Sequence, residues 1–168
     1  SFDDSLQYTK DNILGTHILL ECCRKVGNIE RIIHVSTDEV YGESMNHVNE
    51  QSKTEQSILC PTNPYAATKA SSDHLVSSYV RTFKIPAIVT NCSNNYGPYQ
   101  FPEKLIPHMI LNALQGKFLP VYGDGSQIRD WLNVSDHVNA LIQVMQKGKI
   151  GTTYNICHLY TSDSADDS

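Results

Sequence analysis

The sequence has little charge and no concentration of basic residues. Its 168 residues are 18% charged, with a formal net charge of -5, and lysine and arginine do not gather in one stretch. Nucleic acids and anionic membrane surfaces are bound through clustered basic side chains. The sequence also lacks an apolar run near the roughly 18 residues that a membrane span needs. We therefore expect a small-molecule ligand, and neither nucleic acid nor membrane as a partner.

The cysteines and histidines lack the spacings of a disulfide framework or a metal site. The five cysteines are odd in number and contain no Cys-x-x-Cys pair. The seven histidines form no His-x-x-x-His or His-Glu-x-x-His pattern. These patterns argue for free thiols, no metal ion and a reducing, cytoplasmic location.

The apolar spacing predicts alternating helices and strands. Three- and four-residue spacing favours helices, whereas short β-branched runs favour strands. The helices are predicted over 11–26, 64–83, 102–114 and 134–145, and the strands over 31–35, 85–89, 119–122 and 153–156. Because helices and strands alternate, we predict parallel βαβ units and an α/β fold.

A polar heptapeptide, residues 36–42, directly follows the first predicted strand. It contains Thr37, Asp38 and Glu39, and open α/β sheets bind ligands at the carboxyl ends of their strands. Two adjacent carboxyls can act as an acid and a base when their surroundings separate their pKa values. The alternative is structural, since Ser36 and Glu39 have the Ser-x-x-Glu spacing of a helix capping box.

Tyr65 and Lys69 are four residues apart on the second predicted helix, so they share one of its faces. A phenol has a pKa of about 10, and a neighbouring ammonium would lower that pKa and make the phenol a better base. The same spacing also arises from simple amphipathicity. The Tyr65–Lys69 pair becomes evidence for a catalytic site only in combination with the polar heptapeptide.

Two later segments carry polar groups suited to a ligand. Residues 93–107 include Asn95, Glu103 and Lys104, which suit a polyhydroxylated molecule but equally fit a solvated loop. Residues 123–130 place glycines beside Arg129, which could hold a diphosphate or form a surface pair with Asp130. They are not a dinucleotide fingerprint, because the third glycine is missing.

Taken in order, these motifs resemble the dTDP-glucose 4,6-dehydratase family of the extended short-chain dehydrogenases/reductases. The resemblance covers residues 1–156. It rests on Ser-Thr-Asp-Glu-Val-Tyr-Gly at 36–42, Asn-Pro-Tyr-Ala-x-x-Lys-Ala at 63–70, the stretch 94–107 and Gly-Asp-Gly-x-x-Ile-Arg-Asp-Trp-Leu at 123–132.

The resemblance implies a partial Rossmann-type parallel sheet with helices on both faces, plus part of a smaller substrate-binding domain. It assigns residues 1–92 to the NAD-binding Rossmann domain and 93–156 to mixed Rossmann and substrate-binding segments. Residues 157–168 end in a polar acidic tail, which we expect to be disordered or artefactual.

The resemblance also implies a role for each site residue. Tyr65, Lys69 and Thr37 would oxidise the sugar at C4, Glu39 would take the C5 proton, and Asp38 would protonate the departing 6-hydroxyl. NAD would be the cofactor, and the protein would be a homodimer. The implied contacts are Tyr65, Lys69 and Ser93 with NAD, and Asn95, Glu103, Lys104 and Arg129 with the nucleotide-diphosphate sugar.

Two departures from the family pattern carry expectations of their own. The N-terminal Gly-x-x-Gly-x-x-Gly turn is missing from the sequence, so we expect this fragment neither to bind NAD alone nor to be active alone. Asn91 stands where relatives have arginine, which removes one expected contact of the cleft. Two alternative functions stay open, namely the same reaction on UDP-glucose and an inactive member of the superfamily that acts as a binding module.

Overall fold

A long helical run opens the fold. The computed structural model describes residues 5–42, 53–121, 123–125 and 129–157. The run consists of α1 (Ser5–Tyr8), a π-helical turn (Thr9–Leu14) and α2 (Gly15–Val26). It ends at Gly27, whose φ of 77° is the left-handed conformation that glycine adopts without strain. The predicted helix over 11–26 is thus confirmed at its end, and the run begins earlier.

The central sheet has three parallel strands in the order β1, β2, β5. These are β1 (Ile32–Thr37), β2 (Ala87–Cys92) and β5 (Thr153–Ile156). Thr37 pairs with Cys92, and Cys92 pairs with Ile156. The carboxyl ends of the three strands therefore lie together at one edge of the sheet, and the predicted parallel βαβ arrangement is confirmed.

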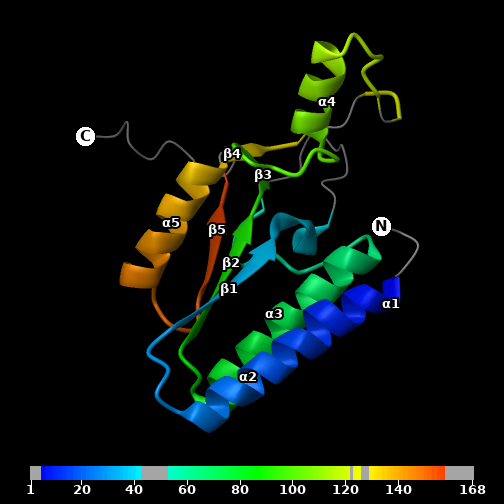
Figure 1. The fold of residues 1–168 in the computed structure, drawn as a ribbon. Coiled ribbons are helices and arrows are strands. Elements are labelled where there is room, and N and C mark those ends of the chain that lie inside the picture. Colours follow the sequence, from blue (N-terminus) through cyan, green and yellow to red (C-terminus); the bar gives the residue numbers. More distant parts are fainter. Residues whose placement is uncertain (1–4, 43–52, 122, 126–128, 158–168) are drawn as a thin grey trace.

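Helices cover both faces of this sheet (Figure 1). The crossover helix α3 (Pro64–Phe83) packs with α2 on one face, and α5 (Val134–Lys147) lies on the other. Asn63 caps α3 and Pro64 occupies its first turn, where the missing N–H of proline costs nothing. The main core lies between α2, α3 and β2 and consists of Leu20, Val76, Tyr79, Ile85, Ala87 and Val89.

A second, two-stranded parallel sheet is formed by β3 (Asn94–Tyr96) and β4 (Trp131–Asn133). Neither strand was predicted, because three residues are too few to show an alternating pattern. Beyond it stands α4 (Leu105–Leu114), which has no buried residue. The strand predicted over 119–122 is wrong for 119–121, where Leu119 and Val121 are exposed and unpaired with any described strand. Tyr122 lies outside the described residues.

The described residues contain neither a membrane-spanning helix nor a cluster of metal-binding side chains. No described helix combines the length and the apolar character that crossing a membrane requires. No group of three or more His, Cys, Asp or Glu within the described ranges is placed to hold a metal ion. The expected tail falls at residues 158–168, outside the described part of the chain.

Candidate active site

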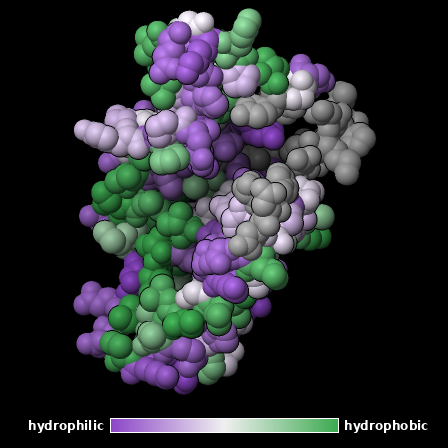
Figure 2. Space-filling view, turned by 45° about the vertical axis from the view of Figure 1, so that its right-hand side comes forward, coloured by the Kyte–Doolittle hydropathy of each residue, from purple (hydrophilic) through white to green (hydrophobic). Residues whose placement is uncertain are grey.

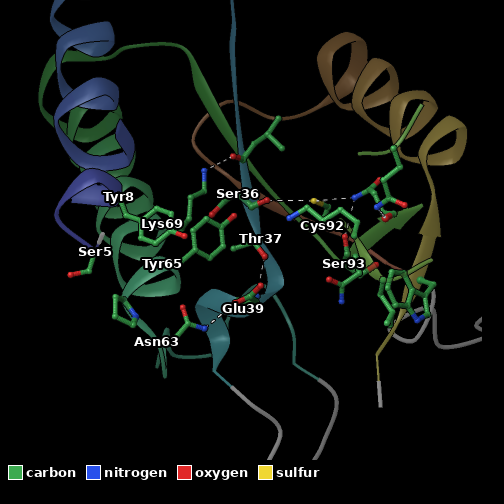
Figure 3. A pocket seen from close by; sticks show the side chains of 18 residues that line it. Ser5, Tyr8, Ser36, Thr37, Glu39, Asn63, Tyr65, Lys69, Cys92 and Ser93 are labelled. Carbon is green, nitrogen blue, oxygen red and sulfur yellow. Dashed lines mark hydrogen bonds between the residues drawn. The ribbon is translucent and has the colours of Figure 1, made fainter. Parts of the chain in front are cut away.

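A pocket of about 810 Å³ opens at the carboxyl ends of β1 and β2 (Figure 3). It is lined from four directions: the end of β1, the first turns of α3, the end of β2 and the segment that leads into α4. Among the predicted site residues, those on its walls are Thr37, Glu39, Tyr65, Lys69, Ser93, Asn95 and Lys104. Segments far apart in the sequence thus meet where an open α/β sheet binds ligands.

The Thr-Asp-Glu triplet marks the turn from β1 into a short 3-10 helix (Asp38–Tyr41). Thr37 caps this helix, since its Oγ1 accepts a hydrogen bond from the Glu39 N–H at 3.3 Å. The same hydroxyl donates to Asp38 Oδ1 at 3.3 Å. The alternative capping box from Ser36 is not formed, because the Ser36 hydroxyl donates to Asp73 instead.

The two carboxyls of the triplet have different surroundings. Burial raises the pKa of Asp38, the hydrogen bond from Thr37 opposes that shift, and the charge of Glu39 adds to it. Asp38 stands between two residues of the pocket wall but is not itself on that wall. Glu39 is exposed, and its Oε2 accepts from Asn63 Nδ2 at 3.0 Å. The local structure therefore favours a proton on Asp38.

Asn63 connects the triplet to the helix that carries Tyr65. Its Oδ1 accepts from the Ala66 N–H at 2.8 Å, which caps α3, while its amide nitrogen holds Glu39. The Asn-Pro pair in the sequence is a signal for the cap. The contact with Glu39 could not be read from the sequence, because the two residues belong to different elements.

Tyr65 and Lys69 both line the pocket, but their contacts differ from those predicted. Lys69 Nζ donates to the Val35 carbonyl oxygen at 2.8 Å rather than to the phenol. Burial raises the pKa of Tyr65, and the charge of Glu39 raises it further. The predicted lowering of this pKa is therefore corrected, because the ammonium is engaged elsewhere. Burial also lowers the pKa of Lys69, against the opposing charge of Asp73.

Two residues of the wall were not predicted from the sequence. The Tyr8 ring meets the Tyr65 ring edge-on, with 5.7 Å between centroids. Cys92 Sγ lies 3.5 Å from the Ser36 carbonyl oxygen, to which it donates, and burial raises the pKa of this thiol. No local pattern marks either residue, since each acts on partners far away in the sequence.

The remaining predicted residues divide into two groups. Ser93 is 3% exposed, and its Oγ has no hydrogen-bond partner among the described residues. Asn95 lies beside it and donates to the Ser93 carbonyl at 3.0 Å. Glu103 and Arg129 are exposed and do not belong to the pocket wall.

Asn91, which stands where the family pattern has arginine, lies inside the fold. It is 2% exposed, and its Nδ2 donates to the Tyr41 hydroxyl at 2.9 Å. That hydroxyl in turn donates to Asn155 Oδ1 at 2.9 Å. Asn91 therefore belongs to a set of polar contacts inside the fold that joins β2 and β5 to the 3-10 helix after β1.

Comparison with known proteins agrees with this geometry. The family model described as GDP-mannose 4,6 dehydratase matches residues 1–165. The chain belongs to this family.

Three relatives show how near the chain stands to characterised members. It is 54% identical over 164 residues to dTDP-glucose 4,6-dehydratase 1 of Escherichia coli K12, covering 89% of this chain and 45% of that protein. It is 51% identical over 162 residues to a trifunctional UDP-glucose 4,6-dehydratase, epimerase and reductase of Arabidopsis thaliana, covering 93% of this chain and 23% of that protein.

The third relative is a solved structure. The Bacillus anthracis dTDP-glucose 4,6-dehydratase in complex with NAD superposes with a TM-score of 0.85 at 49% identity, covering 91% of this chain and 48% of that one. The chain therefore spans less than half the length of these relatives.

Proposed function

We propose that this chain carries the catalytic residues of a nucleotide-sugar 4,6-dehydratase that acts on dTDP-glucose with NAD. The observation that carries the proposal is the meeting of the Thr37–Glu39 triplet with Tyr65 and Lys69 around one pocket. The names and identities of the relatives support the same reaction.

The pocket suits NAD at three residues of this chain. The buried, unpartnered Ser93 hydroxyl offers a hydrogen bond to a polar ligand, and Tyr65 and Lys69 stand on the same pocket wall. We assign these three residues to the cofactor. NAD, when bound there, would supply the hydride acceptor for oxidation at C4 and the hydride donor for reduction at C6. We expect binding to require the glycine-rich turn that this sequence lacks.

Oxidation at C4 needs a base for the sugar hydroxyl. Thr37 binds this hydroxyl and Tyr65 removes its proton. Because burial raises the pKa of Tyr65, the phenolate needs positive charge nearby. Lys69 lines the same pocket, and turning its ammonium away from the Val35 carbonyl would supply that charge.

Elimination of water then uses the two carboxyls. The new ketone acidifies the C5 hydrogen, which Glu39 removes as a proton. Asp38, whose raised pKa favours the protonated form, gives its proton to the 6-hydroxyl, which leaves as water. A C5–C6 double bond results. Glu39 then gives its proton back to C5, and with a hydride supplied at C6 the product would be the 4-keto-6-deoxy sugar.

The substrate's sugar and diphosphate need polar contacts outside the reacting atoms. Asn95 and Lys104 line the pocket and are assigned to the sugar nucleotide. Glu103 is assigned to the sugar nucleotide as well. Arg129 is assigned to the diphosphate, whose charge a guanidinium can bind with two hydrogen bonds. The nucleotide of the substrate, dTDP or UDP, is left for experiment to decide, since the Arabidopsis relative at 51% identity is named for UDP-glucose.

We further propose that the protein is a cytoplasmic homodimer whose interface includes the helices of residues 11–26 and 64–84, which are the π-helical turn with α2 and the helix α3. Leu14, Ile18 and Leu19 are each more than half exposed. Figure 2 shows hydrophobic side chains on the lower half of the molecule, where Figure 1 places α2 and α3. Exposed apolar side chains grouped on one helix are typical of an interaction surface.

The reaction can be tested with a chimaera, defined as the E. coli K12 relative in which this chain replaces the segment that it matches. We expect the chimaera to convert dTDP-glucose with bound NAD, followed by NMR of the 4-keto-6-deoxy product. Tyr65→Phe should abolish conversion, whereas Phe118→Leu, a change at a fully exposed side chain, should not.

Each alternative predicts a different result. A higher kcat/KM for UDP-glucose than for dTDP-glucose would establish the UDP-glucose reaction. A folded chimaera that converts neither sugar would refute the dehydratase proposal and favour a binding module. The 168-residue chain alone should convert neither.

A further inference from the structure

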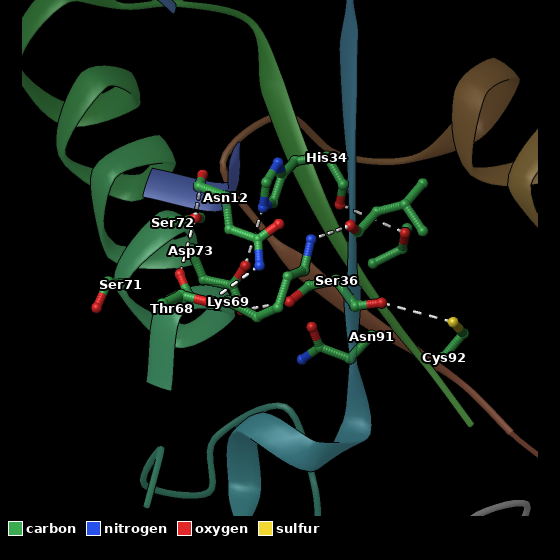
Figure 4. A network of polar contacts seen from close by, with 12 residues as sticks. Asn12, His34, Ser36, Thr68, Lys69, Ser71, Ser72, Asp73, Asn91 and Cys92 are labelled. Carbon is green, nitrogen blue, oxygen red and sulfur yellow. Dashed lines mark hydrogen bonds and ion pairs between the residues drawn. The ribbon is translucent and has the colours of Figure 1, made fainter. Parts of the chain in front are cut away.

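Three consecutive residues of β1 are tied to helix α3 (Figure 4). Ser36 Oγ donates to Asp73 Oδ2 at 2.9 Å, and His34 Nε2 lies 3.1 Å from Asp73 Oδ1. Between these residues, the Val35 carbonyl accepts from Lys69 Nζ at 2.8 Å. The His34 contact has ion-pair distance but not the geometry of a linear hydrogen bond. Asp73 thus accounts for two of the three contacts.

The Asp73 carboxylate lies in the interior. Asp73 is 5% exposed and Ser36 is 3% exposed. Burying a carboxylate costs free energy unless donors and charges surround it. Removing one partner of such a buried pair costs more than the pair contributes, because the other polar group is left unsatisfied. The helix and strand are therefore held in the one register in which these groups meet.

The position of this contact relative to the pocket gives it a consequence. Asp73 is four residues after Lys69 and eight after Tyr65, so all three lie along one side of α3. On the strand, Ser36 directly precedes Thr37. The Asp73 contacts therefore join the helix that carries Tyr65 and Lys69 to the strand that leads into the Thr37–Glu39 triplet, on the inner side of both.

We propose that Asp73 is a positioning residue, which through Ser36 and His34 fixes α3 against β1 and so sets Tyr65 and Lys69 against the Thr37–Glu39 triplet. Its effect on the chemistry rests on the dehydratase function proposed above. The position of α3 against β1 does not depend on that function, because it is a property of the folded chain.

The negative charge of Asp73 also acts on Lys69, because it favours the protonated ammonium. The groups that shift the pKa of Lys69 are Asp73 on its own helix and Cys92 on β2, and both oppose the lowering caused by burial. The titratable groups of other elements that interact with Asp73 are His34 of β1 and Tyr41 of the 3-10 helix. When the Asp73 charge is removed, less negative charge opposes the effect of burial, so the pKa of Lys69 falls further.

The first test uses the 168-residue chain and needs no activity. Lysines are labelled as 13C-dimethyl derivatives and titrated by NMR, and Lys69→Arg identifies the Lys69 signal. Asp73→Asn keeps the size of the side chain but removes its charge, so we expect the Lys69 midpoint to move to lower pH. The matched control is Ser71→Ala, whose hydroxyl bonds only to the Ala67 carbonyl among the described residues, and it should leave the midpoint unchanged.

The second test uses the chimaera. Ser36→Ala and Asp73→Asn should lower kcat by about 10-fold or more while KM for the sugar nucleotide changes little, since misplacement of reacting groups acts on the chemical step. Ser36→Ala removes a single hydroxyl, so it keeps the test valid if Asp73→Asn unfolds. Ser36→Thr, which restores the hydroxyl, should recover part of the lost rate.

The outcomes separate the two proposals. A Lys69 midpoint in Asp73→Asn equal to that of Ser71→Ala, or a wild-type kcat in both Ser36→Ala and Asp73→Asn, would overturn the positioning role. If the unaltered chimaera is inactive, the proposed function fails instead. The Lys69 titration does not depend on activity and then still decides whether the Asp73 charge acts on Lys69.

Discussion

At the scale of single residues, Asp38 and Glu39 are neighbours in sequence with different surroundings. Asp38 is partly buried and accepts a hydrogen bond from Thr37, whereas Glu39 is exposed and held by Asn63. The difference supports separate roles as acid and base.

The first prediction separates these roles from that of Tyr65. In the chimaera, Asp38→Asn and Glu39→Gln should lower product formation by about 100-fold to 10,000-fold, the usual contribution of general acid–base catalysis. Both should still oxidise C4, seen as absorbance of the reduced nicotinamide in a single turnover. Tyr65→Phe should lose this signal, because it lacks the base for the first step.

A contrary result is easily recognised. If Asp38→Asn and Glu39→Gln lose cofactor reduction as completely as Tyr65→Phe, the division of roles between the carboxyls and the phenol is wrong.

The second prediction concerns stability and pH at Asp38. Its pKa is raised in the folded chain by burial, so the neutral carboxyl is favoured by folding. This contribution is fully present below the unfolded pKa of about 3.9 and is lost as the pH rises through the folded pKa. Asp38→Asn cannot ionise, so its free energy of unfolding relative to wild type should increase from pH ~4 to pH ~7 in urea denaturation.

The same experiment contains its own check. Glu30→Gln, at an exposed carboxyl, should follow the wild-type pH dependence. An unchanged difference between Asp38→Asn and wild type across the range would mean that the Asp38 carboxyl ionises as readily in the folded chain as in the unfolded one.

At the scale of elements, the 3-10 helix that carries Asp38 and Glu39 depends on the glycine that ends it. Gly42 has a φ of 80°, and a Cβ at this position would lie 2.2 Å from the Cys60 carbonyl oxygen. Both the backbone conformation and the close approach require glycine.

The third prediction uses a matched pair of glycines. Gly27 has a similar φ of 77°, but a Cβ there would meet no atom within 4 Å. Gly27→Ala should cost about 1–2 kcal/mol for the left-handed conformation alone. Gly42→Ala should cost more than that and should also lower turnover in the chimaera, because the Cys60 backbone and the 3-10 helix must move apart.

Thermal and urea unfolding of the two variants measure the difference. Equal losses of stability in Gly27→Ala and Gly42→Ala would mean that the Cys60 contact relaxes freely and does not hold the acid–base turn.

At the scale of the whole molecule, the apolar surface of α2 is the most consequential feature. Leu20 turns into the core at 2% exposed, whereas the preceding Leu19 is 59% exposed. A helix that is apolar on its inner and its outer side needs a second partner.

The fourth prediction follows from this surface. The chain should sediment as a dimer, and Leu19→Lys should shift it towards monomer, because the introduced ammonium would lose its hydration in the interface. Ile58→Lys is the control, since Ile58 is 86% exposed and belongs to the segment that precedes α3. Sedimentation velocity over a range of concentrations measures the shift. A dimer equally stable in Leu19→Lys and wild type would place the interface elsewhere.

The sequence by itself determined the features that depend on neighbouring residues. Asn63 and Pro64 define the start of α3, Gly27 ends α2, and the alternation of helices with β-branched runs specifies a parallel sheet. The spacing of Tyr65 and Lys69 places them on one helical face. These outcomes follow from backbone geometry and local hydrogen bonding, which act within a few residues.

Only the tertiary structure decided what each side chain meets across elements. The sequence predicted that Lys69 would approach Tyr65, but the Val35 carbonyl of β1 takes its hydrogen bond. Asn91 donates to the Tyr41 hydroxyl inside the fold, a partner that the sequence did not indicate. Burial and distant charges then set the pKa values of Asp38 and Tyr65. Such contacts join residues tens of positions apart, so their partners and their desolvation exist only once helix and strand are packed together.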